Sequence, residues 1–212
     1  GGGEGGCGWS AAVVGARGWV WRAGAGAGCS CEVAVRNGAA GRPRVTGPFD
    51  ESPDVSLAHT GSLAAALVGP PGARSGVGID IERIVDRDDH TVAAILTAAE
   101  RDLLDNLCSS VAERSSWVTR FWAAKEAVAK AAGTELGGRP HRFAIERVDG
   151  DRRLVAVGEG APSRWVQTGG GAETEPYAVT WTGAAKGIPA AAGSDLGRDS
   201  RLEPRVHWPL VR

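Results

Sequence analysis

Three carboxylates in two short segments of the sequence could bind a metal ion. Asp80 and Glu82 lie in Gly-Ile-Asp-Ile-Glu at 78–82, and Glu126 lies in Phe-Trp-Ala-Ala-Lys-Glu-Ala-Val-Ala-Lys at 121–130. Hard divalent cations take oxygen ligands, and magnesium sites typically combine one or two carboxylates with water and a substrate phosphate. These residues therefore predict metal-assisted phosphoryl chemistry, and hence an enzyme.

The first two carboxylates are expected on one face of a strand. The run 77–81 is apolar except for its acidic residue, and side chains alternate between faces in an extended segment, so Asp80 and Glu82 project together while the two isoleucines enter the core. A second apolar run at 63–68 is separated from it by Gly-Pro-Pro-Gly at 69–72, which favours a turn and predicts a hairpin. Taken alone, this acidic pair could also line the polar face of a half-exposed strand.

The third carboxylate is expected on a long helix. Apolar residues follow the helical period over about 113–132, and Gly133 suits a left-handed C-terminal cap. Glu126 and Lys130 then share one face. At this spacing alone, the pair would more often be a solvated ion pair than part of a site.

The rest of the chain predicts a further helical segment and a sheet. A helical pattern begins at Asp89, with Asp88 or Asp89 as its cap, and short strands between glycine-rich turns are expected in the first forty residues. An antiparallel sheet is predicted from four later strand-like runs, at 143–148, 153–157, 164–167 and 177–181. The stretch from about 188 is expected to be a tail.

Composition narrows the class of protein. The 212 residues suit one domain or two small halves that share a core, and 24 basic against 25 acidic residues give a formal net charge of −1. No overall field attracts nucleic acid or an anionic membrane, and no apolar run reaches spanning length, so a cytoplasmic protein with neither partner is expected. The cysteines are too few and too irregularly spaced for a disulfide framework, so reduced thiols are expected at Cys7, Cys29, Cys31 and Cys108.

Taken in order, the motifs resemble those of the 4′-phosphopantetheinyl transferases, in particular the surfactin-synthetase-activating branch. The segment 77–82 is similar to the strand motif of that family, and 121–130 is similar to its aromatic-x-x-Lys-Glu-x-x-x-Lys helix motif. Upstream, Val-Ser-Leu-Ala-His-Thr at 55–60 resembles its Ser-His segment, and Gly-Arg-Pro at 41–43 resembles its Gly-Lys-Pro segment. The resemblance covers roughly residues 41–185 and is most specific where the strand and helix motifs occur together.

The resemblance implies an α+β fold in which antiparallel sheets pack with long helices, as two pseudo-symmetric halves of which the first is reduced. Residues 1–70 would be the reduced N-terminal half that contributes to coenzyme binding, 71–187 the metal-binding and catalytic half, and 188–212 the tail. Members of this branch usually carry a longer first half. The short one here, in a sequence without methionine, fits a transferase domain at the end of a larger synthase such as a polyketide synthase.

The activity that the resemblance implies is transfer of 4′-phosphopantetheine from coenzyme A to a serine of an acyl or peptidyl carrier protein domain, releasing adenosine 3′,5′-bisphosphate. Asp80, Glu82 and Glu126 would hold Mg²⁺ against the diphosphate of coenzyme A, which is a substrate here. The carrier domain and coenzyme A are thus the expected partners.

The resemblance also implies roles for the neighbouring charged residues. Glu126, or a metal-bound water beside it, would be the base for the serine hydroxyl, and Lys130 would neutralise or protonate the leaving phosphate. Lys125 would contact the same anion. His59 and Arg42 would bind the 3′-phosphate of the coenzyme or neighbouring anionic groups, although a structural histidine is an equally good interpretation of His59.

Two other functions fit the same residues. A generic magnesium phosphohydrolase would use the carboxylates with water as the nucleophile, and would hydrolyse simple phosphoesters without a carrier. A degenerate transferase domain would only dock on a carrier or stabilise a larger synthase, and would bind a carrier without modifying it.

Overall fold

The structure is a computed structural model, and it describes residues 34–38, 42–47, 49–61, 63–72, 76–150, 153–158, 163–170 and 177–183. Of the short strands expected in the first forty residues, only the last falls in this part, as β1 (Ala34–Asn37). The expected tail from 188 lies outside the described residues. No helix among the described residues is long and apolar enough to cross a membrane.

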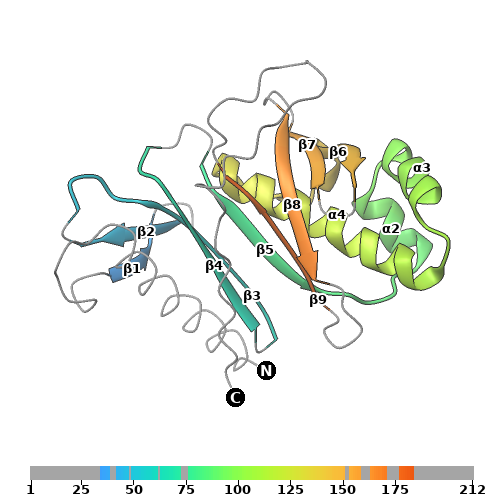
Figure 1. The fold of residues 1–212 in the computed structure, drawn as a ribbon, viewed down its shortest axis with the longest axis horizontal. Helices are drawn as coiled ribbons and strands as arrows, with labels where there is room; N and C mark the ends of the chain where they lie inside the picture. The colour runs from blue at the N-terminus through green and yellow to red at the C-terminus, as the bar shows by residue number, and fades with distance from the viewer. Residues whose placement is uncertain are drawn as a thin grey trace.

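The strands form two antiparallel pairs and one larger sheet (Figure 1). β1 pairs with β2 (Pro43–Thr46), and β3 (Asp54–Thr60) pairs with β4 (Leu63–Gly69). The larger, five-stranded sheet is antiparallel and has the spatial order β5 (Gly78–Arg83), β9 (Tyr177–Thr182), β8 (Arg164–Gly170), β7 (Arg153–Gly158) and β6 (Phe143–Asp149). The predicted antiparallel sheet is confirmed, and β5 joins it as an edge strand.

The predicted hairpin between the runs at 63–68 and 77–81 is wrong. β4 pairs with β3 instead, from Asp54 opposite Gly69 to Thr60 opposite Leu63, and β5 pairs with β9. β3 is the nearer partner in the chain, and Gly61 has a positive φ of 54° at the tight turn between them. A short connection closes at low entropic cost, which favours pairing of β4 with β3.

Two helices stand where one helical pattern was predicted. α2 (Asp89–Ile95) begins after Asp88, whose side chain accepts a hydrogen bond from the Thr91 N–H, as expected of a cap. The chain is extended at Leu96, and Thr97 then starts α3 (Ala98–Leu107) with a capping box to Glu100. The apolar period runs through both helices, but the capping box satisfies the free N–H groups of a new helix start.

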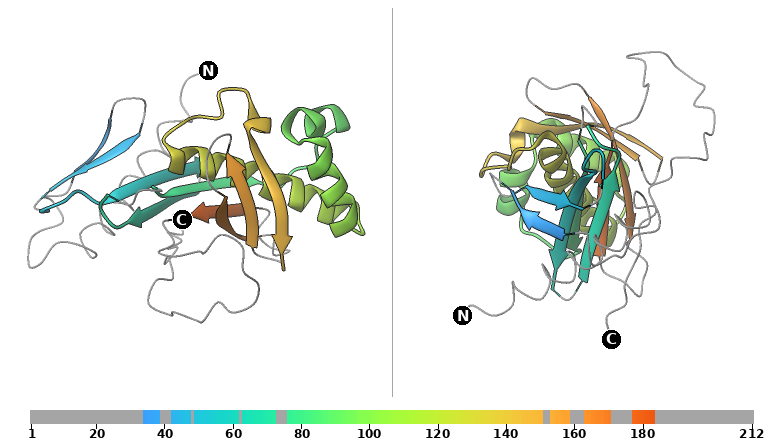
Figure 2. Two further views of the ribbon diagram at one scale, coloured as in Figure 1. Left: turned by 90° about the horizontal axis from the view of Figure 1, so that it is seen from above. Right: turned by 90° about the vertical axis from the view of Figure 1, so that its left-hand side faces the viewer.

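The long helix α4 (Val111–Ala132) confirms the prediction for 113–132. It ends at Gly133, which has φ 74° and ψ 25° and donates its N–H to the carbonyls of the last turn, as predicted. α4 crosses one face of the five-stranded sheet (Figures 1 and 2). The main core lies under it, with fully buried side chains such as Phe121, Leu154 and Val166.

The other face of β5 packs against the β3–β4 hairpin. Ile79 and Ile81 are fully buried there in a cluster with Ala58 and Leu67, so the predicted inward direction of the two isoleucines is confirmed. The β1–β2 pair covers the opposite face of the hairpin through Val45 and its neighbours, at the end of the molecule away from α2 and α3 (Figure 2).

A glycine lets α4 lie directly on β5. A Cβ atom at Gly78 would overlap the carbonyl oxygen of Ala127 in α4. The strand and helix backbones therefore touch at this point, and the residues that follow Gly78 on the same face of β5 must lie beneath the helix.

Candidate functional site

The three predicted metal ligands lie where α4 crosses β5. Asp80 and Glu82 point to the α4 side of the strand, because the alternate isoleucines fill the other face. Asp80 is buried with 6% of its surface exposed, Glu82 is half-buried, and Glu126 is half-buried on α4.

Lys130 is the counter-charge of Asp80. Its Nζ donates to Oδ1 of Asp80 at 2.7 Å and to the carbonyl oxygen of Ile79 at 3.2 Å. The second carboxylate oxygen, Oδ2, is buried and accepts no hydrogen bond. The ammonium thus satisfies one half of the carboxylate and leaves the other available to a further cation or donor.

Trp122 is a site residue that the sequence interpretation missed. Its Nε1 donates to Oε1 of Glu82 at 3.1 Å, so the side chain is not only part of the core. Trp122, Glu126 and Lys130 follow one another at intervals of four on α4, and therefore form one stripe of the helix. That spacing, beside an acidic strand, is the signal that could have identified it.

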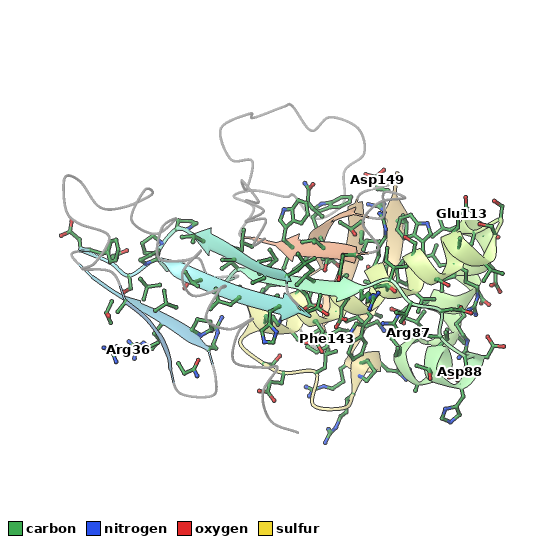
Figure 3. All side chains as sticks on the ribbon, turned by 90° about the horizontal axis from the view of Figure 1, so that it is seen from below. Arg36, Arg87, Asp88, Glu113, Phe143 and Asp149 are labelled. Carbon is green, nitrogen blue, oxygen red and sulfur yellow. The ribbon has the colours of Figure 1, made fainter. Side chains whose placement is uncertain are left out.

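Arg87 is a second residue outside the predicted set. Its guanidinium donates to Oγ1 of Thr119 in α4 at 2.7 Å, and its charge lowers the pKa of Glu82 against the effect of burial. Figure 3 shows Arg87 just before Asp88, between β5 and α2. This arginine partly offsets the negative charge of Glu82.

The carboxylates influence one another electrostatically. The pKa of Glu126 is raised by burial first and then by the negative charges of Asp80 and Glu82, while Lys130 opposes the shift. The pKa of Glu82 is raised by burial and by Asp80, and burial raises the pKa of Asp80 against the attraction of Lys130. A concentrated negative charge of this kind is what a cation site provides.

The structure brings two of the predicted coenzyme contacts near this group. His59, exposed on β3, acts on Asp80 with its charge. Arg42 is exposed just before β2, and its Nη2 lies 3.4 Å from the carbonyl oxygens of both Lys130 and Ala131, at the C-terminal end of α4. Both basic side chains thus lie around the end of α4 that carries Lys130.

The structure does not bring Lys125 to this group. Its ammonium is fully buried, and it donates to Glu100 Oε2 at 2.8 Å and to the carbonyls of Ile95 at 2.9 Å and Pro140 at 3.3 Å. An ammonium has three donors, and all are used here. Glu100 also accepts from the Ile145 N–H at 2.7 Å. Lys125 therefore ties α4 to α3 and β6, and we do not retain it as a contact to the coenzyme.

The donor set fits a hard cation, although the side chains are not gathered around one. Among the described residues, no three His, Cys, Asp or Glu side chains lie close enough together to hold a metal ion. Lys130 binds Asp80 and Trp122 binds Glu82 instead. However, the unpaired buried Oδ2 of Asp80 and the all-oxygen character of the group suit Mg²⁺. The three carboxylates remain the predicted ligands.

Comparison with known proteins identifies the family. The sequence model of the 4′-phosphopantetheinyl transferase superfamily matches residues 76–182, slightly more than half of the chain, from just before β5 to the end of β9. No curated protein matches the chain significantly. The matched region contains the acidic strand, the whole of α4 and the sheet that carries them, and this chain belongs to the 4′-phosphopantetheinyl transferase superfamily.

Proposed function

We propose that this protein transfers 4′-phosphopantetheine from coenzyme A to a serine of an acyl or peptidyl carrier protein domain, with Mg²⁺ as cofactor. Family membership supports phosphopantetheinyl transfer in general. The observation that supports the rest is the position of Asp80 and Glu82 on the face of β5 that α4 crosses, with Glu126 and Lys130 on that helix.

Glu126 is the proposed base. Its pKa is raised by burial and by Asp80, which brings a carboxylate closer to the pH range in which it can accept a proton effectively. In the proposed reaction it takes the proton of the carrier serine hydroxyl. The serine oxygen then forms a bond to the phosphorus next to pantetheine, and the bond from that phosphorus to the bridging oxygen breaks.

Lys130 is the proposed partner of the leaving phosphate. The electron pair of the broken bond stays on adenosine 3′,5′-bisphosphate, whose new phosphate oxygen needs a positive charge or a proton. The side chain of Lys130 is 32% exposed, so its ammonium can reach both Asp80 and a ligand above the site. Release from Asp80 would free it for the phosphate.

Asp80, Glu82 and Glu126 would hold the magnesium ion. The ion, when bound, polarises the phosphoryl group and offsets charge on the leaving group. Arg42 and His59 would bind the 3′-phosphate or neighbouring anionic groups of the coenzyme, since both are exposed basic side chains near the end of α4.

Mass spectrometry of a carrier domain incubated with the protein, coenzyme A and Mg²⁺ tests the proposal. The wild type is expected to add phosphopantetheine to the carrier serine, and Glu126→Gln, which keeps the size of the side chain but removes its charge, is expected to abolish the addition. Glu146→Gln is the matched control, because Glu146 is exposed on β6 at a distance in the chain from the carboxylate group. It should transfer like the wild type.

The same assay separates the other two functions. Release of phosphate from simple phosphoesters without a carrier would favour a phosphohydrolase. Binding of the carrier with no mass increase, in the presence of coenzyme A and Mg²⁺, would favour a scaffold. Full transfer by Glu126→Gln would remove Glu126 from the mechanism.

A further inference from the structure

A row of buried hydroxyl groups runs across the sheet from Asp80. Thr180 on β9 is the direct cross-strand partner of Asp80, and Thr168 on β8 is the direct partner of Thr180. Paired residues of neighbouring antiparallel strands point to the same face. The three side chains therefore lie in line beneath α4, across strands that Figure 1 shows as neighbours.

Each member of this row has a buried polar atom without a partner. Thr180 is fully buried, Thr168 is 1% exposed and Asp80 is 6% exposed. Oγ1 of both threonines and Oδ2 of Asp80 are buried with no hydrogen bond. Buried polar groups are nearly always paired, and three adjacent exceptions in one row need a common explanation.

The chemistry of the three groups supplies that explanation. A carboxylate oxygen can only accept, whereas a threonine hydroxyl has one donor and two acceptor positions and rotates to suit its neighbours. The structure contains neither bond, but a rotation about χ1 moves a threonine Oγ1, and it would let Thr180 donate to Oδ2 of Asp80 while accepting from Thr168. Hydrogen bonds in such a chain strengthen one another, and a charged acceptor at its end makes the last bond a strong one.

We infer that the side chains of Thr168 and Thr180 turn to form a two-hydroxyl chain that ends on Oδ2 of Asp80 and positions this carboxylate to receive a divalent cation. The threonines are positioning residues, since they act only through Asp80. The inference deepens the proposed function, and its metal-binding part rests on that function. Lys130 holds Oδ1 from the helix side, so the carboxylate would be held at both oxygens.

Two substitutions separate the hydroxyl from the shape of the side chain. Thr180→Val keeps the branched shape but removes the hydroxyl, and Thr180→Ser keeps the hydroxyl. Thr182→Val is the matched control: Thr182 is equally buried on the same strand and face, but its hydroxyl donates to the Trp165 carbonyl at 2.8 Å.

The first measurement is urea unfolding without divalent ions. The direction in which Thr180→Val moves the unfolding midpoint shows whether Thr180 donates a hydrogen bond to Asp80. Replacing an unpaired buried hydroxyl by a methyl group removes an unfavourable polar group, so the unfolding midpoint should then stay level or rise. Removing a donor from a buried carboxylate has the opposite effect. We expect Thr180→Val to unfold at a lower urea concentration than the wild type, and a level or raised midpoint would overturn the hydrogen bond from Thr180 to Asp80.

The second measurement is titration with Mn²⁺ followed by electron paramagnetic resonance, without coenzyme or carrier. Thr180→Val should raise the Mn²⁺ dissociation constant about tenfold or more, as loss of a partner to a metal ligand typically does. Thr180→Ser and Thr182→Val should bind Mn²⁺ like the wild type. Equal affinity of Thr180→Val and wild type, or equal weakening by Thr182→Val, would overturn the positioning role.

The two-hydroxyl chain also predicts that the losses of Mn²⁺ affinity caused by its two threonine substitutions will not add. Thr168→Val should weaken Mn²⁺ binding less than Thr180→Val does. It should cause no further loss in combination with Thr180→Val, because Thr168 acts on Asp80 only through the Thr180 hydroxyl. Fully additive losses would contradict a chain. If the wild type bound no Mn²⁺, the metal-binding part of the proposed function would fail, and the positioning role with it. The urea comparison would still show whether Thr180 donates a hydrogen bond to Asp80.

Discussion

The two lysines of the Lys-Glu-x-x-x-Lys segment have opposite environments. Lys125 is fully buried against Glu100, whereas the Lys130 side chain is 32% exposed beside Asp80. The pKa of Lys125 is lowered by burial and held up by Glu100, so the pair is compensated only as long as both members are present.

We therefore expect Lys125→Met to reduce the free energy of unfolding by about 3–5 kcal/mol, because it leaves the carboxylate of Glu100 buried without its counter-charge. Urea unfolding measures this loss. Lys130→Met should cost less stability, because burial raises the pKa of Asp80 and this carboxylate can take up a proton when the ammonium is removed; the variant should also reduce the rate of transfer. Equal stability losses in the two variants would show that the burial of Lys125 has little energetic consequence.

A second prediction concerns the indole N–H of Trp122. Trp122→Phe keeps an aromatic ring but removes the N–H that binds Glu82. We expect the Mg²⁺ concentration for half-maximal transfer to rise about tenfold, because Glu82 loses the donor that orients it.

Trp117→Phe is the control for that measurement. Trp117 lies on the same helix, half-buried, and packs edge-on against Phe121 with ring centroids 6.1 Å apart and beneath Arg120. It contacts the aromatic core rather than the carboxylates. An equal change in the Mg²⁺ requirement of this variant would assign the effect to packing.

At the scale of the elements, the contact between α4 and β5 depends on Gly78. A side chain there would collide with the backbone of α4, and a backbone cannot rotate away as a side chain can. We expect Gly78→Ala to reduce the free energy of unfolding by about 3 kcal/mol. It should also weaken divalent cation binding, since helix and strand would separate.

Gly169→Ala is the matched control in the same sheet. A Cβ atom at Gly169 would meet only the ring of Trp181, at an ordinary 3.7 Å. This variant should fold with nearly unchanged stability and bind the cation like the wild type. If both variants were equally stable, close backbone contact at Gly78 would not be what holds the two elements together.

The same elements show what could be predicted from the sequence. α4 and the strands from β6 to β9 were predicted because each signals itself locally, by a helical period with Gly133 at its end or by short apolar runs between turns. The pairing of β4 with β3 was not predicted, because strand pairing depends on contacts between separate segments of the sequence. The break at Thr97 was missed because the apolar period continues across it.

Some residues of the candidate site could likewise be predicted from the sequence, and others could not. Asp80, Glu82 and Glu126 were predicted from residue type and spacing, and the structure brings their elements together. The buried position of Lys125 could not be predicted, because its partner Glu100 lies 25 positions away and the sequence does not show which side of α4 meets α3. The same limit applies to Trp122 and its partner on β5.

At the scale of the whole molecule, the carboxylate group makes stability depend on pH. The raised pKa of Glu126 means that the folded protein binds more protons than the unfolded chain between the ordinary and the raised value. The free energy of unfolding therefore falls as pH rises through that window. Asp88 and Glu113, whose pKa values are lowered by hydrogen bonds at the helix starts, act in the opposite direction.

The difference between wild type and Glu126→Gln isolates this effect. Without divalent ions, we expect Glu126→Gln to be more stable than the wild type at about pH 8, with the gap closing toward about pH 4.5, the ordinary pKa of a glutamate. Thermal unfolding at several pH values measures it. Mg²⁺ at a hundred times its dissociation constant should stabilise the wild type by about 2.7 kcal/mol and leave the variant unchanged. A gap that does not vary with pH would contradict this account.

The β3–β4 hairpin has a practical consequence for work with this protein. It lies outside the matched region 76–182, yet it covers Ile79 and Ile81 on the outer side of β5. A recombinant fragment cut to the matched region would present a bare, apolar edge strand to water, which favours self-association. Arg42, which reaches the end of α4 from just before β2, would be lost as well. The smallest soluble piece should therefore begin ahead of β2.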